Sequence, residues 1–124
     1  MHAVGSMTPA AYSRRCHWIA DIGCLACRRS GWFKQPDVHH LNFDGKAGQE
    51  RLGNAATVGL CPWHHRGLPF EGKNAAWCRR VVGPSLAHES TAFRETFGTD
   101  LALLAEQNRL IEERELNVVG RRIA

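Results

Sequence analysis

The alternation of hydrophobic and polar positions predicts a helix near the start of the chain. Thr8-Pro9 suits a capping residue followed by proline at the first helical position. Tyr12, Cys16 and Ile19 then recur at helical spacing and share one face. Glycine follows this run at position 23. We therefore expect an N-terminal helix over residues 8–23.

Two short runs further along are typical of strands. Residues 38–41 and 56–60 are apolar or β-branched in large part, and glycine and polar residues bound them. The stretch over residues 42–54 between them predicts a long loop. A helical turn carrying His64 and His65 is expected after the second strand.

The second half of the chain predicts helices. Residues 67–84 show no regular pattern, so we expect an irregular segment there. Pro84-Ser85 suits the cap of a helix over residues 86–97, and Thr99-Asp100 suits the start of a last helix. The helices are expected within residues 85–116, followed by a loose basic tail over residues 117–124.

The size and composition of this chain of 124 residues favour one folded domain, which spans residues 8–124. Residues 1–7 end in Gly-Ser-Met, which is typical of an artificial leader, and they are set aside. A hydrophobic content of 44% excludes wholesale disorder, and no apolar run is long enough to span a membrane. No secretion signal is recognisable, and the five cysteines are an odd number. A reducing, cytoplasmic environment is therefore expected.

The charge pattern favours a phosphate-bearing partner. The formal net charge is +4, and arginine occurs as doublets at residues 14–15, 28–29, 79–80 and 121–122. A guanidinium group can bind phosphate with two parallel hydrogen bonds. A merely solvated basic surface is the alternative interpretation.

Two ligand pairs at matching intervals predict a structural zinc site. Cys24-x-x-Cys27 and Cys61-x-x-His64 each place two donors on one side of a turn, and together they complete a tetrahedron. Inert core cysteines would have no reason to repeat this interval. Cys78 in place of His64 is the alternative fourth ligand.

Three histidines exceed the needs of that zinc. Neighbouring residues of a strand point to opposite faces, so His39 and His40 should not bind one ion side by side. One would face the helical turn that carries His65, and the other an open groove. Phosphodiester hydrolysis needs this division, because a metal ion neutralises the phosphate while a separate base takes a proton from water.

These motifs, in this order, resemble the HNH (ββα-metal) endonuclease family over residues 24–66. The residues that carry the resemblance are Cys24-x-x-Cys27, His39-His40, Asn54 and Leu60-Cys61-x-x-His64-His65. The flanks, with Pro84-Ser85-Leu86-Ala87-His88 and Phe97-Gly98, are similar to the phage recombination-enhancement (Ref-type, RecA-dependent) nucleases. One departure is His64, which stands where that family's pattern has cysteine.

The resemblance implies an α+β fold in which a small ββα-metal core is stabilised by structural zinc and flanked by N- and C-terminal helices. It also implies roles: His40 is the general base, Asn54 braces it, and His39 and His65 hold a second, divalent catalytic metal. His88 is either a third ligand, a phosphate contact or an ordinary exposed histidine. An all-imidazole set favours zinc, nickel or manganese over magnesium.

The expected substrate is DNA, cleaved with little sequence preference during phage-type recombination in the bacterial cytosol. By resemblance, a recombinase filament would be the partner that targets it. The basic residues expected to bind the backbone are Arg28, Arg29, Arg66, Lys73, Arg79 and Arg80. Two alternatives stay open: a non-catalytic zinc-stabilised nucleic-acid-binding module, and a structural zinc protein that contacts other proteins.

Overall fold

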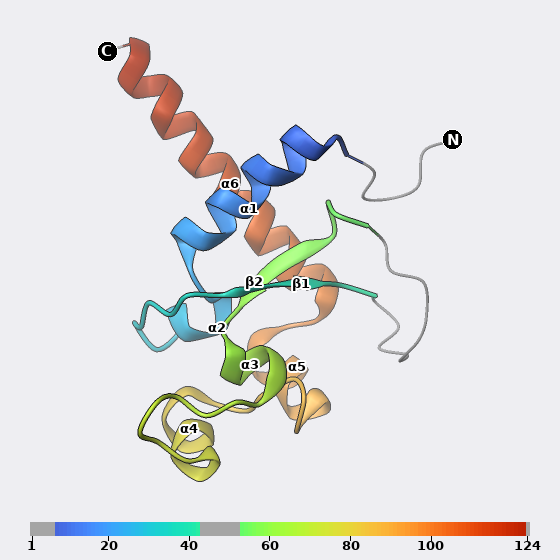
Figure 1. The fold of residues 1–124 in the computed structure, drawn as a ribbon, viewed down its shortest axis with the longest axis vertical. Coiled ribbons are helices and arrows are strands. Elements are labelled where there is room, and N and C mark those ends of the chain that lie inside the picture. The colour runs from blue at the N-terminus through green and yellow to red at the C-terminus, as the bar shows by residue number, and fades with distance from the viewer. Residues whose placement is uncertain (1–6, 43–52, 124) are drawn as a thin grey trace.

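The computed structural model describes residues 7–42 and 53–123, with side chains up to residue 120. Residues 1–6 of the expected leader and 43–52 of the expected loop lie outside this part. Figure 1 shows the element order in the described part: α1 (Pro9–Ile22), α2 (Leu25–Arg28), β1 (Asp37–His40), β2 (Thr57–Leu60), α3 (Pro62–Arg66), α4 (Ala75–Val82), α5 (Ser90–Phe97) and α6 (Asp100–Ile123).

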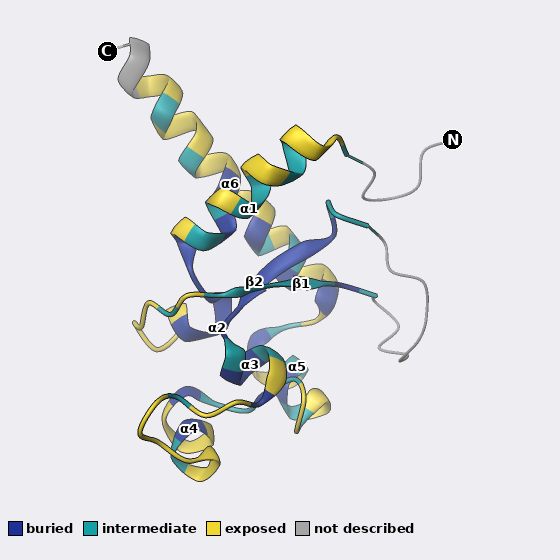
Figure 2. Cartoon of the chain, viewed as in Figure 1, coloured by how far each residue is buried: buried dark blue, intermediate teal, exposed yellow. Residues whose placement is uncertain are grey.

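The centre of the fold is β2, which pairs with β1 in an antiparallel ladder. All four residues of β2 are buried, whereas those of β1 are partly exposed (Figure 2). Helices α1, α2 and α6 contact β2, and the Gly59 amide donates to Gln107 Oε1 of α6 at 2.8 Å. The predicted α+β class, with a small sheet flanked by helices and a metal-binding cluster, is confirmed.

The N-terminal helix and both strands form where the pattern predicts them. The Thr8 hydroxyl accepts from the Ala11 amide at 3.1 Å, and Gly23 ends α1 with an amide that donates to the Ile19 carbonyl. The strands start or end within one residue of the predicted limits. Local capping residues and short apolar runs were therefore enough to predict these three elements.

The helix predicted over residues 86–97 begins only at Ser90, so that limit was wrong. Ser85 instead closes a separate turn, in which its hydroxyl accepts from the His88 amide at 3.0 Å. Glu89 has φ −143° and ψ 64°, which interrupts the helical path. The Leu86 amide donates to the His64 carbonyl at 2.8 Å, which ties this turn to α3.

Two further expectations need correction. Residues 67–84 contain a helix, α4, which Asn74 caps by accepting from the Trp77 amide at 2.8 Å. The tail expected from residue 117 is helical to Ile123, although Asn117 and Gly120 are of types that often end helices. No proline interrupts α6 there, and each residue added to a formed helix gains a hydrogen bond. Its C-terminal half projects from the body in Figure 1.

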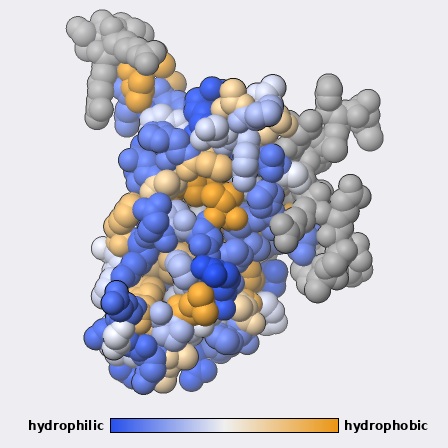
Figure 3. All heavy atoms as spheres, in the orientation of Figure 1, coloured by the Kyte–Doolittle hydropathy of each residue, from blue (hydrophilic) through white to orange (hydrophobic). Residues whose placement is uncertain are grey.

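The surface visible in Figure 3 is mainly hydrophilic, with small separate hydrophobic areas. In the described part of the chain, no helix is both long and apolar enough to cross a membrane.

The two ligand pairs meet at the end of the sheet. Ligand atoms of Cys24, Cys27, Cys61 and His64 all lie within 4.8 Å of one another, and all four residues are buried. Cys78 lies outside this group and its sulfur instead accepts from the Phe70 amide at 3.4 Å. The fourth member of the cluster is therefore His64, as the main interpretation of the sequence predicted.

The spacing of these atoms suits zinc. Zinc bonds of about 2.3 Å to sulfur and 2.0 Å to nitrogen place tetrahedral neighbours about 3.8 Å (sulfur to sulfur) and about 3.5 Å (sulfur to nitrogen) apart. The Cys27 and Cys61 sulfurs are 3.7 Å apart. His64 Nδ1 lies 3.4 to 3.5 Å from the three sulfurs. The donor set and its size thus match a structural metal such as zinc.

Hydrogen bonds prepare the donors of this cluster. His64 Nε2 donates to the Val82 carbonyl at 2.8 Å, which leaves Nδ1 as the ligand atom. Burial lowers the pKa of His64, but hydrogen bonds to Cys24 and Cys61 outweigh it and raise the pKa to about 9. Hydrogen bonds to Cys24 and Cys27 hold the pKa of the Cys61 thiol far below its ordinary range. These hydrogen bonds favour the thiolate form of Cys61, which zinc binds, but they also raise the pKa of the Cys27 thiol, so metal binding displaces protons from Cys27 and His64.

Removing the metal should unfold the core. A structural zinc supplies about 10–16 kcal/mol of apparent binding free energy, which matches or exceeds the roughly 5–15 kcal/mol stability of a whole domain. A strong chelator at neutral pH, or Cys24→Ser, should abolish the cooperative thermal transition measured by circular dichroism. Cys16→Ser, the same change outside the cluster, should keep the transition and one bound zinc. A sharp transition after verified loss of zinc would contradict a structural role.

Candidate functional site

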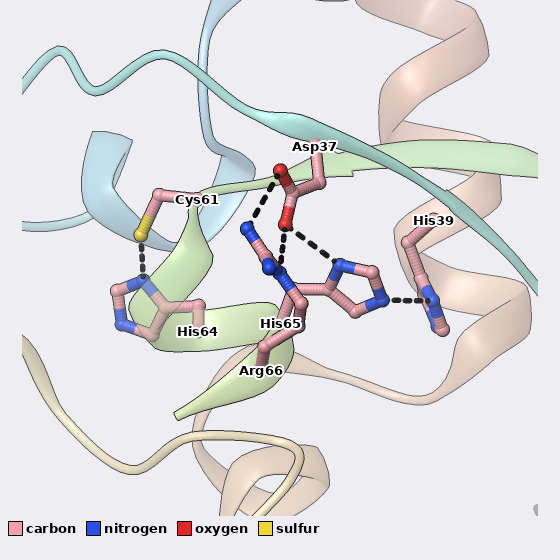
Figure 4. Close-up of polar contacts among 6 residues, drawn as sticks. All are labelled: Asp37, His39, Cys61, His64, His65 and Arg66. Atoms are coloured by element: carbon pink, nitrogen blue, oxygen red, sulfur yellow. Dashed lines mark hydrogen bonds and ion pairs between the residues drawn. The ribbon is translucent and has the colours of Figure 1, made fainter. Parts of the chain in front are cut away.

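The second group of polar side chains lies along one face of β1. His39 Nδ1 is 3.1 Å from His65 Nε2, and His65 Nδ1 is 3.0 Å from Asp37 Oδ2. Figure 4 shows His65 between Asp37 and His39, with Arg66 on the other side of the carboxylate. Asp37 and His39 share this face because side chains two residues apart on a strand point the same way.

Helix α3 serves both the metal cluster and this face. Its consecutive residues His64 and His65 point in opposite directions, His64 to Cys61 and His65 to His39 (Figure 4). The helix ends at Gly67, whose φ of 73° is left-handed and favours glycine. One short helix thus links the buried cluster to the partly exposed histidines.

The hydrogen bonds fix which nitrogen of His65 is available. A carboxylate only accepts, so His65 Nδ1 carries the proton and Nε2 offers its lone pair. With metal–nitrogen bonds of about 2.0–2.1 Å, two nitrogen ligands of one ion lie about 2.9–3.4 Å apart. The 3.1 Å between His39 Nδ1 and His65 Nε2 falls within that range. The pair is therefore spaced to hold a metal ion in place of the shared proton.

Asp37 belongs to this site, although the sequence interpretation did not include it. Besides His65, its carboxylate accepts from Arg66 Nε at 2.9 Å. An acidic residue that orients a metal-binding histidine is a common arrangement. The signal was available in the spacing, because Asp37 stands two residues before His39, but the predicted strand began only at residue 38 and so left Asp37 out.

His40 lies on the opposite face of β1. Its Nε2 is 3.0 Å from Asn54 Oδ1, and its ring centroid is 6.2 Å from that of Tyr12. The amide oxygen accepts, so His40 Nε2 carries the proton and Nδ1 is the basic nitrogen. The structure thus places His39 beside His65, as the alternation along the strand predicted, and His40 beside Asn54, as the family resemblance implied.

A second layer holds Asn54. The Thr57 hydroxyl donates to the Asn54 carbonyl at 2.8 Å, and Arg15 of α1 donates to Thr57 through Nε at 2.7 Å and a terminal nitrogen at 2.6 Å. Burial lowers the pKa of Arg15. The sequence interpretation treated Arg15 only as part of a surface doublet. Nothing local reveals its role, since Arg15 and Thr57 are 42 residues apart.

His88 lies beside α3 instead of on the face that carries His39. Its Nε2 donates to the Gly67 carbonyl at 3.1 Å, and its ring centroid is 5.8 Å from that of Trp63. Within the part of the chain that the structure describes, His39, His65 and His88 do not form a three-ligand group. Ligation by His88 would require the ring to leave the Gly67 carbonyl.

The basic residues expected to bind DNA come from α2, α3, α4 and the segments beside them. Arg29 pairs with Glu106 at 2.9 Å, and Arg79 pairs with Glu89 at 3.5 Å. Lys73 lies over the Trp77 ring. Arg28 and Arg80 are exposed, as is Arg66, which keeps about half of its side chain in solvent while it binds Asp37. The six basic residues are thus spread over several elements, and Arg29, Arg66 and Arg79 are ion-paired.

Comparison with known families agrees with this geometry. The family model described as recombination enhancement, RecA-dependent nuclease matches residues 8–112, which include the metal cluster, both histidine faces and His88. No curated protein and no solved structure gives a match. The matched range covers most of the chain. The chain therefore belongs to the family of recombination enhancement, RecA-dependent nucleases.

Proposed function

We propose that this chain is an HNH-type, metal-dependent endonuclease that hydrolyses DNA phosphodiester bonds. The observation that carries the proposal is that two different histidine groups lie on the two faces of β1. On one face, His39 and His65 are spaced as two ligands of one metal ion would be. On the other face, His40 is hydrogen-bonded to Asn54. Membership in a nuclease family supports the reaction class.

The metal and the base have separate roles in this proposal. His39 and His65 would hold a divalent ion (zinc, nickel, manganese or magnesium), which supplies charge neutralisation at the phosphate and the departing oxygen. Asp37 keeps the His65 ring in the ligand orientation. The partly exposed Arg66 guanidinium can donate to a second phosphate oxygen.

His40 performs the proton transfer. Its Nδ1 takes a proton from water as the water attacks phosphorus, while Nε2 stays bonded to Asn54. Asn54 stabilises the imidazolium that forms, because its amide oxygen accepts from the charged ring. Thr57 and Arg15 keep Asn54 in place.

The partner follows from the family. The family description names RecA dependence, so we propose a recombinase filament on DNA as the setting for cleavage, in phage-type recombination within the bacterial cytosol. Basic side chains on α2, α3 and α4 would add affinity that depends on salt and not on sequence.

Removing the base should stop cleavage but not binding. General acid–base catalysis contributes about 10²–10⁴-fold in rate, so His40→Ala should lower plasmid nicking by about that factor. The assay should include the recombinase filament and several divalent metals. His17→Ala is the matched control, since His17 is exposed on α1 beside Trp18, and it should nick at the wild-type rate.

Equal nicking by wild type and His40→Ala would remove His40 as the base. Tight DNA binding by the wild-type chain with no nicking under any of these conditions would instead favour a zinc-stabilised binding module.

The ligand set predicts a metal preference. Imidazole nitrogens suit zinc, nickel and manganese better than magnesium, which prefers oxygen. Manganese or nickel should therefore support faster nicking than magnesium at equal concentration, after removal of the weakly bound metal. His39→Asp, which substitutes an oxygen ligand, should raise the magnesium-to-nickel rate ratio. Full wild-type activity with magnesium alone and inhibition by every transition metal would contradict the proposed site.

A further inference from the structure

A cluster of aromatic rings lies away from the histidine site. Trp32 follows α2, whereas Phe70 and Trp77 come from the segment before α4 and from α4 itself. The ring centroid of Trp32 is 6.1 Å from that of Phe70 and 6.2 Å from that of Trp77, and the last two are 6.1 Å apart. Each ring thus contacts the other two, so two segments distant in sequence hold one another in place.

The rings remain partly in solvent. Trp32 is 39% exposed, and its neighbour Phe33 is 61% exposed. Phe33 is nevertheless held, because it lies against Gly23: a Cβ atom on Gly23 would come within 2.8 Å of the Phe33 ring. Gly23 also has a φ of 87°, which side chains disfavour. An aromatic ring that is fixed in place yet exposed loses little conformational entropy when a flat partner stacks on it.

Positive charges surround these rings. Lys34 Nζ lies 4.2 Å from the Phe70 ring centroid, and Lys73 Nζ lies 4.7 Å from that of Trp77. A hollow of about 460 Å³ beside Trp32 and Phe33 is also lined by Arg28 and Arg29. A second, of about 280 Å³, adjoins Phe70 and Lys34.

Two carboxylates reduce this positive character without cancelling it. Glu106 lines the first hollow and pairs with Arg29, and Glu71 lines the second. The remaining cations at the two hollows and the rings are Arg28, Lys34 and Lys73. The surface therefore combines two exposed aromatic side chains, Trp32 and Phe33, with a surplus of positive charge.

We propose that this surface, defined by Trp32, Phe33, Phe70, Trp77, Lys34 and Lys73, binds single-stranded DNA. Unpaired bases would stack on Phe33 and Trp32, and the phosphates between them would lie near Lys34, Lys73 and Arg28. Aromatic faces interleaved with cations are the arrangement by which proteins bind single strands without sequence preference.

Base-paired DNA fits this surface less well, because its bases are stacked inside the duplex and offer no free face. The inference rests on the proposed function, with DNA as the substrate, and it narrows that substrate to DNA that carries an unpaired segment.

Binding is tested without cleavage, using the full zinc-loaded chain carrying His40→Ala. The probes are a fluorescein-labelled 30-residue oligothymidylate and a labelled duplex of equal length, read by fluorescence anisotropy. Phe33→Leu keeps an apolar side chain but removes the stacking face, and it should raise Kd for oligothymidylate about tenfold. Lys34→Gln should weaken binding several-fold and flatten its salt dependence. The duplex Kd should change less than twofold with Phe33→Leu.

Leu116→Ala is the matched control, since Leu116 is 62% exposed on the projecting part of α6, and it should leave both affinities unchanged. Each variant must keep the wild-type melting transition. An unchanged oligothymidylate Kd in a folded Phe33→Leu variant would overturn the inference. So would equal affinity for a polyglutamate peptide, which would indicate a general site for acidic chains.

The two proposals fail separately. If the wild-type chain nicks plasmid DNA but Phe33→Leu leaves the Kd for oligothymidylate unchanged, only the proposed single-strand-binding surface is wrong. If Phe33→Leu weakens oligothymidylate binding but the wild-type chain nicks plasmid DNA with none of the metals, only the nuclease proposal is wrong.

Discussion

The contact on which the rest of the structure depends is the meeting of three sulfurs and one imidazole nitrogen at the end of β2. The four residues are buried, so without a metal three sulfurs and one ring nitrogen would face one another in a largely apolar interior. The cluster joins α2 to α3, and the bond from His64 Nε2 to the Val82 carbonyl adds the end of α4.

This anchoring matters for the histidine face because His64 and His65 are consecutive. When His64 is held by the sulfurs, the helical rotation between neighbouring residues directs His65 toward β1. Loss of the cluster would therefore also separate His65 from His39. In this fold, the buried metal cluster and the proposed catalytic metal site share one turn of helix.

The two faces of β1 are supported by different parts of the chain. The face with His39 depends on α3 and on Asp37 of the same strand. The face with His40 depends on Asn54, Thr57 and ultimately Arg15 of α1. The proposed base and the proposed metal ligands are thus positioned by separate sets of contacts, so a change on one face need not disturb the other. The aromatic surface is built from a third set of elements, the segment after α2 together with α4 and the residues before it.

The sequence by itself determined the features that depend on local spacing. Two x-x intervals identified the metal cluster, alternation along a strand separated His39 from His40, and capping residues set the limits of α1. Tertiary structure decided what depends on residues far apart. It selected His64 over Cys78 as the fourth ligand, because only His64 Nδ1 lies among the three sulfurs. It placed Arg15 on Thr57 and brought Trp32 against Phe70 and Trp77. It also held His88 on the Gly67 carbonyl and divided the helix predicted from residue 86 at Glu89. No periodicity reports such contacts, since they exist only once the metal cluster and the buried strand have packed the helices together.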